Sequence, residues 1–150
     1  MNLIYSCVFF QESYITLLEL LLTGYKLYEN ENIKYLILCN PDFKNKIQNI
    51  IKNLDINYDI WCLNLNTKFE AAYSRFKIFN YIDIDKYSKI LYLDCDILIT
   101  NNIQNIFDLS IENKLYVLKE HCHRQFHCCL FNDEEYATLD KKKTFTSGII

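Results

Sequence analysis

The chain alternates between short apolar runs and longer segments with helical spacing. Four runs are suited to buried strands: residues 3–10, 34–40, 58–65 and 89–99. Three segments between them place apolar residues at about every third or fourth position: 13–30, the segment that begins at Pro41, and 69–82. The predicted order is β-α-β-α-β-α-β. Near-continuous apolar strands alternating with helices are typical of an α/β fold with a Rossmann-like, mostly parallel sheet and helices on both faces.

Two carboxylates, Asp94 and Asp96, interrupt the fourth apolar run in the sequence YLDCDILI (92–99). An unpaired buried charge costs on the order of several kcal/mol, and the apolar flanks argue against a surface turn. In an extended strand both carboxylates can face one ligand while Cys95 faces the other way. Open parallel sheets bind ligands outside the carboxyl ends of their strands. We therefore expect a divalent cation, Mn²⁺ or Mg²⁺, to be held here together with substrate phosphates.

A second acid pair has the same spacing but a different context. Asp83 and Asp85 lie in YIDIDKY, between the third predicted helix and the fourth strand. That position favours a solvated turn rather than a ligand site.

Composition narrows the class of protein. With 150 residues, 51% hydrophobic and 15% aromatic, the chain has ample material for one domain with a core. A net charge of -3 without a basic stripe argues against a nucleic-acid partner. The seven cysteines are odd in number and lack a disulfide-framework spacing, which favours free thiols. The sequence shows neither a signal core nor a span of about 20 apolar residues, so we expect a cytoplasmic protein with no transmembrane segment.

The segment 72–107 resembles the middle of the glycosyltransferase family 8 domain, the glycogenin-like group with the GT-A fold. There a basic residue on a helix precedes an apolar strand that ends in Asp-x-Asp (the DXD motif), and a short helix follows. Three further matches occur in the order that the family shows: VFFQESYITLLELL near the N-terminus, LYVLKE after the Asp-x-Asp region, and FTSGII at the end.

The resemblance implies a hexosyltransferase that uses a UDP-sugar, with UDP-glucose or UDP-galactose the favoured donors and an unknown acceptor. It implies that Asp94 and Asp96 bind the metal that bridges the donor diphosphate, and that Arg75 contacts the diphosphate or the sugar. These three are the catalytic candidates. It also implies that Tyr14 packs on the uracil. The nucleotide site implied in full is Phe9, Phe10, Gln11, Tyr14, Arg75, Asp94, Cys95 and Asp96.

The donor-sugar position falls on Thr146 and Ser147 in the segment FTSGII. Thr146 departs from the asparagine of the family. The resemblance covers nearly all of residues 1–150 but only about the first half to two-thirds of the family's catalytic domain. We therefore expect a single N-terminal, nucleotide-sugar-binding portion, truncated before the family's late histidine motif. A catalytically inactive remnant that binds nucleotide or a partner is the main alternative, and a homodimer is also left open.

Simpler interpretations accompany each of these assignments. Arg75 can be a helix-surface cation, and Tyr14 and the phenylalanines can be core residues. The strand around Asp94 also resembles the nucleophile strand of haloacid-dehalogenase-type phosphatases, although that motif normally ends the first strand of its domain. The cluster HCHRQFHCC (121–129) holds zinc-competent residue types without two separated chelating pairs, so a variable loop is favoured over a zinc-binding module.

Overall fold

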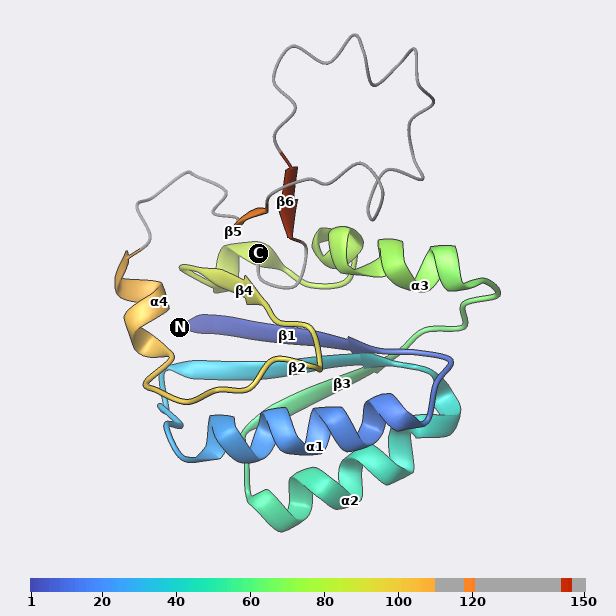
Figure 1. Cartoon of the computed structure of the whole chain (residues 1–150), viewed down its shortest axis with the longest axis horizontal. Coiled ribbons are helices and arrows are strands. Elements are labelled where there is room, and N and C mark those ends of the chain that lie inside the picture. Colours follow the sequence, from blue (N-terminus) through green and yellow to red (C-terminus); the bar gives the residue numbers. More distant parts are fainter. Residues whose placement is uncertain (110–117, 121–143, 147–150) are drawn as a thin grey trace, which may run out of the picture.

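The computed structural model describes residues 1–109, 118–120 and 144–146, and it contains a four-stranded sheet (Figure 1). The strand order is β3-β2-β1-β4, and all neighbours are parallel. The strands of this sheet are β1 (Asn2–Val8), β2 (Ile33–Cys39), β3 (Tyr58–Cys62) and β4 (Ile90–Tyr92). The expected parallel sheet is confirmed.

Helices cover both faces of this sheet (Figure 1). On one face lie α1 (Ser13–Lys26) and α2 (Lys44–Leu54), which follows the short 3₁₀ helix η1 (Pro41–Phe43). On the other face α3 (Lys68–Ser74) continues directly into the 3₁₀ helix η2 (Arg75–Asn80). The remaining helices are η3 (Ile84–Lys86) and α4 (Gln104–Leu109). The two-sided α/β architecture predicted from the alternation is therefore confirmed.

Alternation along β1 divides the core into two layers. Leu3 and Tyr5 point to the face covered by η2, whereas Ile4 and Val8 point to the face covered by α1 and α2. All four side chains are buried, as expected for a central strand with helices on both sides.

The strand order creates a topological switch point next to β1. The chain runs outward from β1 to β2 and β3, and β4 then pairs on the opposite side of β1, with Tyr5 beside Tyr92. Open α/β sheets bind ligands outside the carboxyl ends of the strands at such a point. The segments that follow β1 and β4 are therefore the natural place for a site.

The predicted fourth strand, 89–99, is wrong in its extent. Leu93 still donates its N–H to the Tyr5 carbonyl at 3.0 Å, but the chain then turns, and Ile97 donates its N–H to the Asp94 carbonyl at 3.2 Å. Asp94 and Asp96 thus follow the strand rather than lie within it, and strand alternation does not orient them. The apolar run continues because Ile99 packs into the core from the segment after the turn.

The third predicted helix, 69–82, also differs in detail, because the α-helix ends at Ser74 and 3₁₀ geometry follows. Asp83 and Asp85 are exposed at η3, as expected for a solvated turn. A separate antiparallel pair joins β5 (Leu118–Glu120) to β6 (Thr144–Thr146). Within the described parts of the chain, no helix is long and apolar enough to cross a membrane.

Candidate active site

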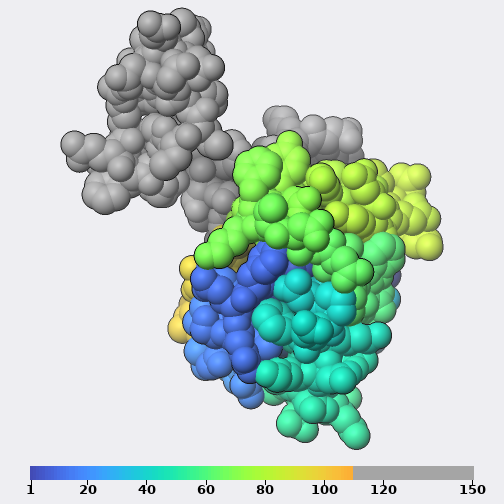
Figure 2. Space-filling model, turned by 90° about the vertical axis from the view of Figure 1, so that its right-hand side faces the viewer, coloured from blue at the N-terminus to red at the C-terminus, as the bar shows by residue number. Residues whose placement is uncertain are grey.

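A cavity of about 260 Å³ lies at the carboxyl ends of β1 and β4. Figure 2 faces this side of the molecule, where α3 (green) overlies the N-terminal segment (blue). The cavity is lined by the ends of β1 and β4 with the segments that follow them, by the first turn of α1, and by α3–η2. Its lining residues are Cys7, Phe9, Phe10, Gln11, Tyr14, Lys68, Ala71, Ala72, Arg75, Tyr92, Asp94, Cys95 and Asp96. All eight residues of the predicted nucleotide site are among them.

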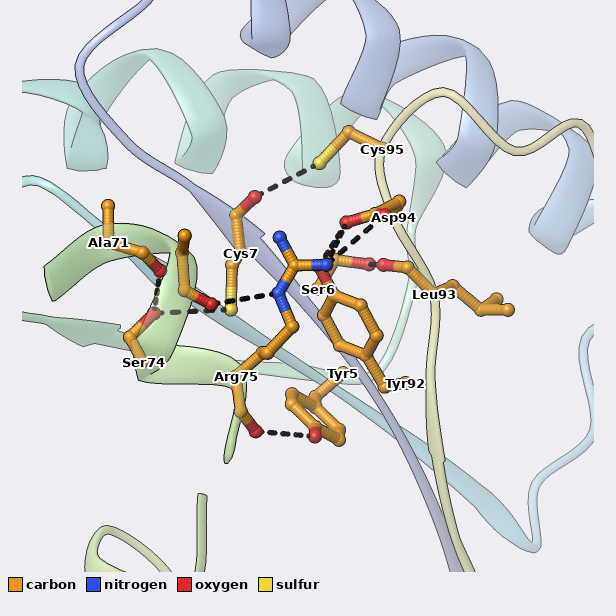
Figure 3. Close-up of polar contacts among 11 residues, drawn as sticks. Tyr5, Ser6, Cys7, Ala71, Ser74, Arg75, Tyr92, Leu93, Asp94 and Cys95 are labelled. Atoms are coloured by element: carbon orange, nitrogen blue, oxygen red, sulfur yellow. Dashed lines mark hydrogen bonds and ion pairs between the residues drawn. The ribbon is translucent and has the colours of Figure 1, made fainter. Parts of the chain in front are cut away.

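Arg75 and Asp94 form an ion pair in this cavity (Figure 3). The Nη1 atom of Arg75 lies 3.2 Å from Asp94 Oδ1 and 3.3 Å from Asp94 Oδ2. The two side chains are only 18% and 31% exposed, so solvent screens the pair less than it would at the surface. Arg75 therefore lines the cavity as a partly buried cation that is paired with Asp94.

The Arg75 guanidinium is also held by its own helix and by an aromatic ring. Its Nε donates to the Ala72 carbonyl at 3.0 Å, and its Cζ lies 4.9 Å from the centre of the Tyr92 ring. The backbone carbonyl of Arg75 accepts a hydrogen bond from the Tyr5 hydroxyl at 2.7 Å (Figure 3). These contacts fix the position of the cation.

Tyr92 supports the carboxylate as well as the cation. Its hydroxyl donates a hydrogen bond to Oδ1 of Asp94. Burial, followed by the nearby Cys7 and Asp94, raises the pKa of the Tyr92 hydroxyl far above its usual range. Tyr92 therefore keeps its proton and remains a donor to Asp94 at any physiological pH.

The two acids differ in their exposure. Asp94 is half-buried, whereas Asp96 is exposed on the turn and lines the same cavity. No group of three or more metal-binding side chains is found in 1–109, 118–120 and 144–146. Hard divalent cations such as Mg²⁺ commonly use one or two protein carboxylates, with phosphate and water as the other ligands. The oxygen donors present here fit that kind of ion when a phosphate-bearing ligand is also bound.

The aromatic residues of the site divide between core and cavity. Phe9 is buried in the core layer under η2 and also lines the cavity. Phe10 and Tyr14 are 40% and 39% exposed, and Gln11 is exposed beside them. Tyr14 and Phe10 are therefore not core residues, and they present aromatic surface to the cavity.

The two cysteines of the site are structural in character. The Cys95 thiol is buried and donates to the Cys7 carbonyl at 3.3 Å (Figure 3). The Cys7 thiol accepts a hydrogen bond from Ser74 Oγ at 3.7 Å, and burial raises its pKa to about 12. Because the thiolate is the nucleophilic form, neither thiol is poised for attack at neutral pH. Cys95 is placed at the cavity as expected, but as support for the turn.

The structure adds Lys68 and Tyr92 to the polar residues predicted for the site. Lys68 is the first residue of α3, directly after the N-cap Thr67. The Thr67 side chain accepts from the Glu70 N–H at 3.1 Å, and the Glu70 carboxylate accepts from the Thr67 N–H at 3.1 Å. This capping box is visible in the sequence TKFE and could have fixed the helix start. It could not show that Lys68 faces the cavity.

Two groups of predictions lie wholly or partly outside the described residues. Ser147 and the cluster 121–129 are not described, and Thr146 is described only as part of the β6 backbone. The proposed donor-sugar position and the zinc alternative therefore stay as predictions.

Comparison with known proteins agrees with this geometry. The family described as glycosyl transferase family 8 matches residues 8–150. No curated protein matches the sequence. The apo-form glycosyltransferase GlyE of Streptococcus pneumoniae TIGR4 has a TM-score of 0.61 and 17% identity, over 99% of this chain and 32% of that chain. The apo WbbM bifunctional glycosyltransferase has a TM-score of 0.56 and 16% identity, over 79% of this chain and 23% of that chain. The chain thus spans about a third or less of these solved structures.

Proposed function

Because the chain belongs to glycosyl transferase family 8 and has a GT-A-type fold, we propose that it forms the nucleotide-sugar-binding portion of a metal-dependent glycosyltransferase. The observation that carries the proposal is that Arg75, Asp94 and Asp96 line one cavity. The aromatic side chains of Phe10 and Tyr14 line the same cavity. The switch point between β1 and β4 is where such a fold is expected to bind its ligand.

The proposed donor is a UDP-sugar, with UDP-glucose or UDP-galactose favoured by the family. Phe10 and Tyr14 offer exposed ring faces on which a planar base can pack. The two acids line the same cavity from the segment after β4, and Arg75 lines it from η2. A cavity of about 260 Å³ is smaller than the roughly 300–1,000 Å³ of typical small-molecule sites. The described residues therefore account for part of the donor site.

Asp94 and Asp96 are the proposed ligands of Mn²⁺ or Mg²⁺. The bound ion would neutralise negative charge on the donor diphosphate. Tyr92 fixes one oxygen of Asp94 through a hydrogen bond. Asp96 is the more exposed of the two acids and is free to adjust to an entering ion.

Arg75 is the proposed electrostatic catalyst. Sugar transfer breaks the bond between the anomeric carbon and the diphosphate, so negative charge grows on the leaving phosphate oxygen. A guanidinium held in place by Ala72 and Tyr92 stabilises that charge more as it develops than in the resting donor. Lys68 adds a second cation to the cavity lining.

The proposal is tested by calorimetric titration of the 150-residue chain with UDP, first with Mn²⁺ and then with excess EDTA. We expect binding that requires the metal. Asp94→Asn and Asp96→Asn should each abolish metal-dependent binding while the far-ultraviolet circular dichroism stays unchanged. Asp83→Asn and Asp85→Asn are matched controls, because this second acid pair is exposed at η3 away from the cavity. Parent-like UDP binding by either variant of the first pair would show that the site is wrong.

A remnant that binds the nucleotide without transferring the sugar is the second candidate. Release of UDP from UDP-glucose or UDP-galactose with Mn²⁺ separates the two proposals. Turnover supports the enzyme, whereas metal-dependent binding without turnover supports the remnant. The acceptor, a cytoplasmic location and a homodimer also stay as proposals. The location rests on the four described cysteines, Cys7, Cys39, Cys62 and Cys95, which are all free thiols.

A further inference from the structure

Phe10 occupies an unusual backbone conformation at the edge of the cavity. Its φ is 60°, and the residues on either side of it are joined by a hydrogen bond from the Gln11 N–H to the Phe9 carbonyl at 2.7 Å. This is a tight three-residue turn centred on a bulky side chain. Such conformations are energetically unfavourable and persist only where the surrounding structure determines them.

Only one other non-glycine residue in the described chain has a positive φ, and it has an ordinary explanation. Asp55 has φ 52° at the carboxyl end of α2, where its N–H donates to the Ile51 carbonyl. Left-handed residues are common at such helix ends. Phe10 has no helix end to satisfy, so another interaction must hold its conformation.

That interaction comes from Asn40. The Phe10 N–H donates to Asn40 Oδ1 at 2.7 Å, across 30 residues of sequence. Asn40 directly follows β2, and its own N–H donates to the Val8 carbonyl at 3.4 Å. Pro41 comes next and restricts Asn40 to the extended region, where it lies with φ −64° and ψ 147°. The backbone of Asn40 is thus held by Val8 and by Pro41, and its side chain reaches Phe10 from this fixed position.

We propose that Asn40 is a positioning residue for the nucleotide site. Its side chain holds Phe10 in the positive-φ turn, and this turn places the Phe10 ring at the cavity, where the base is proposed to pack. Asn40 is not among the residues that line the cavity, so it acts through Phe10 and not by touching the nucleotide. The inference rests on the proposed function, and it adds a residue that determines recognition of the base.

The location of Asn40 separates this role from the metal site and from general stability. The metal-binding acids follow β4, whereas Asn40 follows β2 on the other side of β1. The bond between Asn40 and Phe10 is exposed to solvent, so its loss leaves no buried polar group unsatisfied. Removing the acceptor should therefore weaken nucleotide binding while the melting temperature stays close to that of the parent.

The test compares UDP affinity in the presence of Mn²⁺, Mn²⁺ affinity alone and melting temperature for three variants. Asn40→Ala removes the acceptor and should weaken UDP binding by about five- to tenfold, because Phe10 is no longer held in its binding conformation before the nucleotide arrives. Mn²⁺ affinity alone should stay within about twofold of the parent. Asn40→Asp keeps an acceptor oxygen at the same place and should restore UDP affinity to within about twofold of the parent.

Two outcomes overturn the inference. One is parent-like UDP affinity of Asn40→Ala, and the other is an Asn40→Asp variant as impaired as Asn40→Ala. If Asn40→Ala does not fold, Asn40→Ser replaces it, because the shorter serine side chain ends before the Phe10 N–H. A folded serine variant with the UDP affinity of the parent would equally overturn the inference. A parent chain that binds no UDP would instead refute the proposed function and this inference together.

Discussion

The Nη1 atom of Arg75 is shared by both carboxylate oxygens of Asp94, at 3.2 and 3.3 Å. The guanidinium therefore occupies the same carboxylate that we propose as a metal ligand. A cation beside Asp94 balances its charge, but it also opposes the approach of a second cation. If Asp94 is a metal ligand as proposed, Arg75 and the metal ion would compete for it until a diphosphate supplied negative charge for both.

Replacing Arg75 should separate nucleotide binding from metal binding. Arg75→Ala removes a charged donor to the phosphates and should weaken Mn²⁺-dependent UDP binding by about ten- to one-hundredfold. Binding of Mn²⁺ alone should become tighter, because Asp94 loses its competing cation. Arg75→Lys, which keeps the charge without the planar guanidinium, should fall between the parent and the alanine variant. Calorimetry with UDP and with Mn²⁺ separately measures both effects. A fall in both affinities would contradict the competition.

Ser6 in β1 links the Tyr35 hydroxyl to the Leu93 carbonyl through buried hydrogen bonds, and its loss should destabilise the fold. Its hydroxyl donates to the Leu93 carbonyl at 2.7 Å, so the Tyr35 hydroxyl, also at 2.7 Å, must be its donor. Ser6→Ala leaves these two buried groups without their partner and should lower the free energy of unfolding by about 1–3 kcal/mol. Tyr35→Phe is the matched control, since it leaves the bond to Leu93 intact and should cost about 0.5–1.5 kcal/mol. Urea denaturation of both variants checks the order.

Gly24 marks a close approach between α1 and the segment that follows the Asp-x-Asp turn. A Cβ at position 24 would lie 2.9 Å from the backbone oxygen of Ile99. Gly24→Ala should therefore destabilise the protein by about 1–3 kcal/mol, although alanine normally favours a helix. Thr23→Ala on the exposed face of α1 should change stability by less than about 0.5 kcal/mol. Thermal unfolding that finds Gly24→Ala as stable as the parent would disprove the close contact.

The raised pKa of the buried Cys39 thiol should lower the stability of the protein at high pH. Burial, with Cys62 adding to it, raises the pKa of the Cys39 thiol from 9.0 to about 12. Below pH 9 the thiol is protonated in both states and its contribution is fully present. Between pH 9 and 12 the unfolded chain loses a proton that the folded chain keeps, so stability falls with rising pH by up to about 1.4 kcal/mol per pH unit.

Cys39→Ala should remove this part of the pH dependence. Urea denaturation at pH 8, 9, 10 and 11 should give a shallower decline for the variant than for the parent. Tyr35, whose pKa burial also raises far above its usual range, contributes in the same direction to both proteins and cancels in the difference. Parallel declines in the two proteins would show that the thiol does not carry the effect.

The sequence by itself determined the architecture and the candidates. Alternating apolar runs and helical segments fix an α/β fold, because local periodicity decides which face of each element is buried. The Asp-x-Asp spacing indicated Asp94 and Asp96, the resemblance to the family added Arg75, and the structure places all three at one cavity.

Only the tertiary structure decided how these residues meet. The end of β4 could not be predicted from the apolar run around Asp94. The run continues to Ile99, which packs into the core although its segment is no longer a strand. The pairs Arg75–Asp94 and Asn40–Phe10 join residues 19 and 30 positions apart. Such contacts depend on the strand order and on where each turn ends. Local periodicity carries no information about either, since every element satisfies its own pattern whichever neighbour it finally meets.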